Sequence, residues 1–532
     1  MIDLLICIIP KINPDAPTVG PAVLKAHCEA EGFSCEVVDF NIKLYNELKS
    51  KNKESLYFKD DALFALDHHT PDLTPDFEVF YNEFEYVFMD WIEFIKEKNP
   101  RVIGLSLLTL FSLSVATRLG ELIRKHIPNL KILWGGAAIE WGIEVFKNRN
   151  LFDDYIYGDG EYSITEYLKG NMTYKGINSL AVNQISNLDD ILLPNYDDIN
   201  WAEYDDIDED MPVYITGSRG CVKRCTFCNV FDMWPDFRYR SGKSIAKEII
   251  SIKERYNRYT FRFTDSLING SMKAFRNLLT ELIEYRKPSN HIIWSSRWIV
   301  SVEDFLTRMI KYNKSKDRRS FWTIKIRNFI SKKIDYKKTN NKFGWSSQWI
   351  VRSKDQSPES DYENMKKSGC VWLEIGLESF SQDVRFHMGK KFTDEDMWWC
   401  LEQLNKYEIP HILLMITGYP TETEENHQTT LRSVKKIFEL GWNKYTYFSF
   451  GNTLMLSNAQ PLYKLIEDDL EYFNSNVDWK YKDNDFETRN RRFNEVNSLV
   501  RELKNKKELS WMNQRAVDNH NKRLENEGVR IT

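Results

Sequence analysis

Three of the eight cysteines in this 532-residue chain lie within eight positions, at Cys221, Cys225 and Cys228. Thiolates spaced this way on one loop can converge on a single metal centre, and the centres that take thiolates include iron–sulfur clusters and zinc. Structural zinc has four protein ligands, but the next histidine is His291 and no cysteine intervenes. A cluster held by three cysteines leaves one iron open for chemistry. The triple therefore predicts a [4Fe–4S] cluster, with zinc as the alternative.

Composition excludes several other classes of protein. Apolar residues make up 42% of the chain and charged residues 28%, so the chain is neither disordered nor fibrous. The net charge of −5 creates no basic field for nucleic acid, and the five scattered cysteines are typical of small buried side chains. The longest weakly polar run, 102–115, is shorter than a membrane span, and the amino terminus lacks the basic start of a signal peptide. We expect a cytoplasmic protein that binds no membrane.

The first 185 residues alternate short apolar runs with helical spacing, which is typical of parallel strands and crossover helices. Gly135 and Gly136 follow one such run and allow a tight turn at a strand's carboxyl end, where open α/β sheets bind ligands. We predict a doubly wound, Rossmann-like domain over 1–185. An acidic connection over 186–210, with ten acids and no Lys or Arg, follows it. The expected strands lie at 4–9, 37–40, 102–108, 132–134 and 155–157.

A second alternating series over 211–455 predicts a partial (β/α)6 barrel whose chemistry lies at the carboxyl ends of the strands. A helical extension is expected over 456–532, because apolar residues there recur at helical spacing. The expected barrel strands lie at 213–216, 260–264, 292–295 or its repeat, 372–376, 412–416 and 445–450.

One sequence repeat complicates the barrel. The heptapeptide Trp-Ser-Ser-Arg-Trp-Ile-Val at 294–300 recurs, with Gln in place of Arg, at 345–351. The barrel needs a single third strand, so we expect one copy to be displaced as part of an insertion. The segment 301–344 between the copies carries 13 Lys and Arg against four acids. A solvated insertion is the favoured interpretation, and a basic arm for RNA or an acidic partner is the alternative.

The segment Ser218-Arg219-Gly220-Cys221-x3-Cys225-x-Phe227-Cys228 resembles the signature of the radical S-adenosylmethionine (SAM) superfamily. The resemblance implies that SAM chelates the open iron and is cleaved reductively to methionine and a 5′-deoxyadenosyl radical, which abstracts hydrogen from a substrate. It also implies an external electron donor such as flavodoxin or ferredoxin. Lys223 and Arg224 depart from the residues common at their positions. The substrate, a small molecule or a peptide, and the catalytic residues have no readable motif.

Further segments extend this resemblance along the barrel. Asp265 ends the second expected strand where family members contact the SAM amino group, although a helix-capping Asp is the alternative. Arg385 is in place to pair with the SAM carboxylate, although a surface salt bridge is equally consistent. Phe227 is expected to shield the cluster from water. The full set of SAM-binding residues implied by the resemblance is Phe227, Asp265, Gly376, Glu378, Ser379, Arg385, Met415 and Gly418.

A doubly wound domain before such a barrel is similar to the cobalamin-binding class of the superfamily. The implied cobalamin contacts are Ser106, Thr109, Gly135 and Gly136. The Asp-x-His-x-x-Gly motif of many cobalamin proteins is missing, since His27 lacks the preceding acid. A vestigial or substrate-docking domain is therefore the alternative. The expected activity is hydrogen abstraction, with methyl transfer to carbon if cobalamin binds. The competing hypothesis is an iron–sulfur or zinc protein that binds nucleic acid without radical catalysis.

Overall fold

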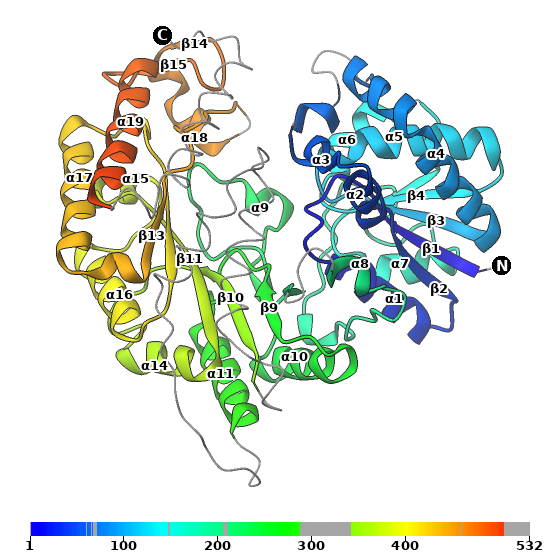
Figure 1. The fold of residues 1–532 in the computed structure, drawn as a ribbon, viewed down its shortest axis with the longest axis horizontal. Coiled ribbons are helices and arrows are strands. Elements are labelled where there is room, and N and C mark those ends of the chain that lie inside the picture. The colour runs from blue at the N-terminus through cyan, green and yellow to red at the C-terminus, as the bar shows by residue number, and fades with distance from the viewer. Residues whose placement is uncertain are drawn as a thin grey trace. The chain divides into compact units, whose positions relative to one another are not determined.

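The computed structural model describes residues 2–504 except 60, 65, 67–71, 147–148, 206–210, 288–341 and 459. The described chain falls into two units. The first contains residues up to Ile215 together with Lys247–Thr260, and the second contains Thr216–Ala246 and the described residues from Phe261 onward. Each unit is an α/β structure (Figure 1). The first heptapeptide copy at 294–300 and nearly all of the predicted insertion at 301–344 lie outside the described residues.

The first unit has a parallel sheet with the strand order β2-β1-β3-β4-β5. All five strands overlap the apolar runs that predicted them. The order reverses direction between β1 and β3, and such a switch point is where open α/β sheets bind ligands. The strands are β1 Ile2–Ile8, β2 Cys35–Asp39, β3 Pro100–Ser106, β4 Lys131–Gly135 and β5 Asp154–Ile156.

Local sequence explains the helices of the first unit. In the longest one, Thr74 caps the amino end by accepting from the Phe77 N–H at 3.2 Å, Pro75 occupies the first turn, and Asn99 ends the helix at a φ of 46°. The helices are α1 Val19–Ala30, α2 Phe40–Ser50, α3 Glu54–Lys59, α4 Pro75–Lys98, α5 Ser112–His126, α6 Ile139–Phe146, α7 Gly160–Leu168 and α8 Ala202–Asp205, with 3₁₀ turns η1 Asp61–Phe64 and η2 Leu188–Asp190.

The acidic segment that follows β5 contacts the first unit through ion pairs. Asp198 pairs with the buried Lys25 and also accepts from the Val37 N–H at 2.8 Å. Asp205 accepts from Arg258 at 2.6 Å, and Asp197 pairs with Arg255. Asp197, Asp198 and Asp205 of the acidic stretch thus each have a basic partner in the first unit.

The second sheet has six strands in the order β13-β12-β11-β10-β9-β6, and its pairings from β10 to β13 are parallel. The second heptapeptide copy forms β10, so the copy at 345–351 supplies the third strand. Figure 1 shows α11, α14, α16 and α17 along one side of this sheet. The strands are β6 Val213–Ile215, β9 Thr260–Phe263, β10 Gly344–Trp349, β11 Cys370–Glu378, β12 His411–Met415 and β13 Thr446–Ser449.

Shorter elements join these strands. A two-stranded antiparallel ribbon of β7 Ser218–Arg219 and β8 Arg238–Tyr239 flanks the cysteine loop. Thr393 and Thr423 form capping boxes at the starts of α16 and α17. The remaining elements are α9 Val230–Met233, α10 Gly242–Tyr256, α11 Met272–Arg286, α14 Glu359–Ser368, α15 Gln382–His387, α16 Asp394–Lys406, α17 Glu424–Glu439 and η4 Trp442–Lys444.

The extension after β13 is helical, but it also contains a hairpin that the sequence analysis did not predict. Its elements are α18 Pro461–Ile466, η5 Glu467–Asp469, the antiparallel strands β14 Leu470–Phe473 and β15 Trp479–Tyr481, and α19 Phe486–Leu503. Trp479 and Tyr481 of the hairpin belong to a buried apolar cluster with Val384, Met388 and Tyr419 of the second unit. The extension therefore adds to the hydrophobic core next to the cysteine loop. Among the described helices, none is long and apolar enough to cross a membrane.

Candidate functional site

The cysteine loop begins at a glycine that no other residue can replace without strain. Gly220 has a φ of 84°, and a Cβ there would lie 2.5 Å from the Asp236 carbonyl oxygen. After this turn Cys221, Cys225 and Cys228 are all half-buried. The Cys228 N–H donates to the Cys225 carbonyl at 3.1 Å, and the Lys223 N–H donates to the Cys221 Sγ at 3.4 Å. The loop thus places three thiols together in a partly dry environment.

The thiols of Cys221 and Cys225 resist ionisation until a positive centre joins them. Burial raises the pKa of Cys221 and raises the pKa of Cys225 to about 11, the neighbouring thiols add to both shifts, and Lys390 opposes them. A bound metal centre stabilises thiolates directly. Tetrahedral structural zinc needs four protein ligands, and the cysteine loop supplies three thiols. The donor set fits a cluster in which each cysteine binds a separate iron.

The end of β11 brings an acid and a base next to the cysteines. Lys390 is buried and donates to the Gly376 carbonyl at 2.7 Å and to Glu378 Oε1 at 3.0 Å. A Cβ on Gly376 would lie 2.9 Å from both side chains. Glu378 adopts a φ of 67°, at a register shift in the pairing of β11 with β12. This strained turn directs the Glu378 carboxylate toward Lys390, whose ammonium also lies 5.9 Å from the centre of the Phe227 ring.

Asp265 does not cap the helix that follows it. Ser271 caps α11 instead, by accepting from the Ala274 N–H. The buried Asp265 carboxylate accepts from the Gly217 N–H at 2.8 Å and from the Ser218 hydroxyl at 2.5 Å. Burial raises the pKa of Asp265 to about 7, although these hydrogen bonds oppose the shift. Asp265 therefore links the end of β9 to the strand that leads into the cysteine loop.

Arg385 forms an ion pair with Asp394, but the Arg385 side chain is fully buried, whereas that of Asp394 is 53% exposed. Its guanidinium donates to the Ser379 carbonyl at 3.0 Å and to Asp394 at 2.5 Å. The Ser379 hydroxyl accepts from the Ser381 N–H at 3.1 Å. Burial lowers the pKa of Arg385, and Asp394 opposes the shift. The donors of Arg385 thus hold the turn after β11 in place.

The turn after β12 is held by the extension. Gly418, with a φ of 78°, donates its N–H to Glu422 Oε2 at 2.7 Å, and a Cβ on Gly418 would lie 2.5 Å from the Arg489 side chain. Arg489 of α19 is buried and donates to three carbonyls, those of Val477, Trp479 and Asn484. The buried Met415 ends β12 before this turn. The predicted SAM residues Met415 and Gly418 therefore lie in a turn whose shape depends on α19.

Tyr419 in the same turn reaches the cysteine loop. Its hydroxyl lies 2.7 Å from Thr226 Oγ1 and 2.9 Å from His387 Nδ1. The Thr226 N–H donates to the Met388 carbonyl at 3.1 Å, and a Cβ on Gly389 would lie 2.9 Å from the Arg224 carbonyl. The cysteine loop, the segment after α15 and the turn after β12 are thus in direct contact.

Sequence reasoning missed several residues of this site. Arg352, shortly after the end of β10, donates to the Asn269 and Gly270 carbonyls, and its charge acts on Cys221. The sequence feature that could have pointed to Arg352 was a basic residue directly after the second heptapeptide copy. Tyr419 and Lys390 lie within segments that carried the family resemblance, but spacing alone did not show that they contact the cysteine loop.

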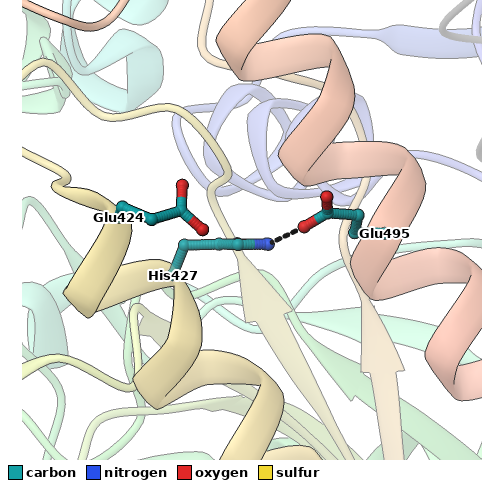
Figure 2. A group of neighbouring side chains, drawn as sticks. All are labelled: Glu424, His427 and Glu495. Carbon is teal, nitrogen blue, oxygen red and sulfur yellow. Dashed lines mark hydrogen bonds and ion pairs between the residues drawn. The ribbon is translucent and has the colours of Figure 1, made fainter.

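A separate group of ligand-type side chains lies on α17 and α19 (Figure 2). Glu424, His427 and Glu495 have ligand atoms within 4.8 Å of one another, and His427 Nε2 lies 2.8 Å from Glu495 Oε2. Arg491 donates to both carboxylates, at 2.6 and 2.9 Å, so their charges are already paired. We interpret this group as an ion network that joins the two helices.

In the first unit, the four residues predicted to contact cobalamin lie at the carboxyl ends of β3 and β4. Ser106 pairs in register with Gly135, and the Leu107 N–H donates to the Gly135 carbonyl at 2.7 Å. A Cβ on Gly136 would lie 2.3 Å from the Leu107 carbonyl oxygen, so a glycine is needed there. Thr109 donates to the Lys11 carbonyl at 2.8 Å.

The loop after β3, which contains Thr109, also carries exposed leucines. Leu108 and Leu110, in the loop after β3, are 43% and 45% exposed. A flat, partly apolar ligand would find an apolar surface here. At this edge, a Cβ on Gly135 would meet only the Ile156 carbonyl, at 4.0 Å. This edge is therefore open next to Gly135 and apolar at Leu108 and Leu110, which fits the chemistry of a ligand with apolar faces such as a corrin.

Comparison with known proteins assigns the class. Residues 348–434 match the radical SAM superfamily, and the chain carries a radical SAM domain. A radical SAM domain implies a [4Fe–4S] cluster and SAM as cofactors. The nucleic-acid-binding alternative finds no support among these comparisons.

Individual relatives match either a short segment of the chain or its fold at low sequence identity. The chain is 37% identical over 71 residues to the ribosomal protein uS12 methylthiotransferase RimO of Lachnoclostridium phytofermentans, a match that covers 13% of this chain and 16% of RimO. The fold is that of the cobalamin-dependent SAM radical enzyme OxsB, solved with aqua-cobalamin, at a TM-score of 0.58 and 14% identity over 88% of this chain and 61% of OxsB. The radical SAM methyltransferase TsrM of Kitasatospora setae, solved with cobalamin and a [4Fe–4S] cluster, gives 0.52 and 14% over 91% and 83%.

Proposed function

We propose that the chain is a cobalamin-dependent radical SAM enzyme that transfers a methyl group to carbon. The observation that carries the proposal is the convergence of three half-buried thiols with Lys390, Glu378 and the turns after β11 and β12. Those turns match the family segments near SAM. The relatives OxsB and TsrM, whose folds this chain shares, are cobalamin-dependent or bind cobalamin, and TsrM is a methyltransferase.

Each group in the site has a task in this proposal. Cys221, Cys225 and Cys228 hold the cluster, which when bound supplies the electron for SAM chemistry at its open iron. Glu378, oriented by Lys390, offers a carboxylate to a polar group of SAM, and the turn that contains Gly418 presents its backbone to the adenine. Phe227 excludes water from the cluster. Asp265 positions the strand that enters the cysteine loop.

In the first unit, the edge formed by β3 and β4 would hold cobalamin through the backbone near Gly135 and through Ser106 and Thr109. The exposed Leu108 and Leu110 would contact the apolar faces of the corrin. The Asp-x-His-x-x-Gly motif that supplies a histidine ligand in many cobalamin proteins is missing from the sequence. An external one-electron donor such as flavodoxin or ferredoxin completes the proposal, and the cytoplasm is the proposed compartment.

The test is anaerobic reconstitution of the full chain with iron, sulfide and hydroxocobalamin, followed by SAM and a reductant. We expect bound iron and sulfide and conversion of SAM to 5′-deoxyadenosine or S-adenosylhomocysteine, measured by chromatography. Cys225→Ala is expected to abolish this conversion, because the cluster loses one of three ligands. Cys400→Ala, at a buried cysteine in α16, is the matched control. Iron-free protein after reconstitution would overturn the proposal.

A further inference from the structure

The Tyr419 hydroxyl is the point at which three segments of the second unit meet. It lies 2.7 Å from Thr226 Oγ1, in the cysteine loop, and 2.9 Å from His387 Nδ1, at the end of α15. Tyr419 itself belongs to the turn after β12 and its side chain is fully buried.

The position of Tyr419 is set independently of the cysteine loop. The Asn484 side-chain amide, from the extension, donates to the Tyr419 carbonyl at 2.7 Å. The preceding residue, Gly418, is fixed by its hydrogen bond to Glu422 and by the close approach of Arg489. The Tyr419 ring also packs edge-on against His387, with ring centres 5.5 Å apart. The phenol is therefore a rigid reference point against which the cysteine loop can be placed.

The chemistry of the Tyr419 phenol, the His387 imidazole and the Thr226 hydroxyl decides which group donates in each hydrogen bond. A phenol carries one proton, so it donates to one partner and accepts from the other. When imidazole Nδ1 carries no hydrogen it can only accept, and then the phenol donates to His387 and accepts from the Thr226 hydroxyl. Thr226 lies between the ligands Cys225 and Cys228, and its N–H is held by the Met388 carbonyl. Removing the phenol oxygen removes the hydrogen bond that ties the Thr226 side chain to the turn after β12.

We propose that Tyr419 is a positioning residue that sets the distance between the iron–sulfur cluster and the nucleotide-binding turn after β12. This inference rests on the proposed function, because it concerns how the same site presents SAM to the open iron. The loop carries the cluster and the turn carries the nucleotide, so a hydrogen bond between them fixes the geometry in which SAM must span both. Losing it is expected to weaken SAM binding and to leave the iron ligands intact.

The experiment compares Tyr419→Phe, Thr226→Val and the double variant in the anaerobically reconstituted full chain. We expect wild-type iron and sulfide content and a three- to tenfold increase in the dissociation constant for SAM in each single variant. The double variant should show no increase beyond that of Tyr419→Phe, because Tyr419→Phe already removes the hydrogen bond to Thr226. The electron paramagnetic resonance spectrum of the reduced cluster is expected to shift less on addition of SAM. Tyr463→Phe, in α18, is the matched control.

The inference is overturned if either single variant, at full iron content, binds SAM and shifts its spectrum as the wild type does. Additive effects of the two changes also overturn it, because they would exclude a shared hydrogen bond. Should Tyr419→Phe lose its iron, Thr226→Val alone decides by the same criteria. The iron content of the reconstituted wild-type protein is measured before any variant is tested. If the wild-type protein gains no iron, the proposed function itself is refuted, independently of Tyr419.

Discussion

At the scale of single residues, the buried Asp265 carboxyl makes a contribution to the unfolding free energy that depends on pH. Its pKa is raised to about 7 by burial, from an ordinary value of 3.8. At a pH between these two pKa values, the Asp265 carboxyl is protonated in the folded chain and ionised in the unfolded chain. The stabilising contribution is therefore complete below about pH 4 and declines as the pH rises through 7, by at most about 1.4 kcal/mol per pH unit.

Asp265→Asn is expected to flatten the fall in unfolding free energy between pH 4 and pH 7, because the amide does not titrate. Denaturant unfolding of the metal-free chain at pH 4.5, 5.5 and 6.5 measures this slope. Asp383→Asn, at an exposed position in α15, is the control and should leave the slope unchanged. An unaltered slope in Asp265→Asn would contradict the assignment.

At the scale of elements, α19 determines the shape of the turn after β12. Arg489 donates to three buried carbonyls, and its guanidinium lies 3.7 Å from the centre of the Trp479 ring. A residue without these donors leaves the carbonyls unpaired in a buried site. Each buried unpaired polar group costs about 1–3 kcal/mol.

Arg489→Met is expected to lower the unfolding free energy of the chain by about 3–5 kcal/mol, measured by denaturant titration. It should also weaken SAM binding, because Gly418 packs against the Arg489 side chain. Arg432→Met, at an exposed position in α17 that pairs with the exposed Glu425, is the control and should change stability by about 0.5 kcal/mol or less. A stability change in Arg489→Met no larger than that of the control would refute this role for α19.

At the scale of the whole molecule, the presence of an α/β unit before the radical SAM domain invites a direct test of cobalamin binding. Gly135→Leu places a side chain into open space at the carboxyl edge of β4, where a Cβ meets only one carbonyl oxygen, at 4.0 Å. The fold should tolerate the change, whereas a corrin at this edge would collide with it.

We expect Gly135→Leu to lower retention of hydroxocobalamin through gel filtration at least tenfold, as measured by absorbance, with an unchanged thermal unfolding midpoint. Asn129→Leu adds the same side chain at an exposed position just before β4, at the opposite edge of the sheet, and should retain cobalamin as the wild type does. Equal retention by the two variants would place cobalamin elsewhere, and no retention by the wild type would refute binding.

Much of the fold could be predicted because strand-length apolar runs and helical spacing are local properties. The predicted strand at 372–376, for example, lies within β11, and Val115, Leu119, Leu122 and Ile123 of α5 are all buried as their spacing indicated. The β14–β15 hairpin was not predicted, because its two strands are short and lie in a charged stretch. The domain boundaries and the roles of the SAM-contacting residues remain predictions.

The candidate site, like the fold, has features that the sequence predicts and features that only the tertiary structure shows. Three thiols within eight positions must lie close together in space, so the sequence alone predicted the cluster ligands and indicated the class of chemistry. Only the tertiary structure showed that Asp265 binds the segment before the cysteine loop, that Arg385 is buried against Asp394, and that Tyr419 meets Thr226. It also decided which heptapeptide copy forms β10. These outcomes depend on contacts between residues far apart in the chain, and two nearly identical segments carry no local signal that distinguishes their places in a sheet.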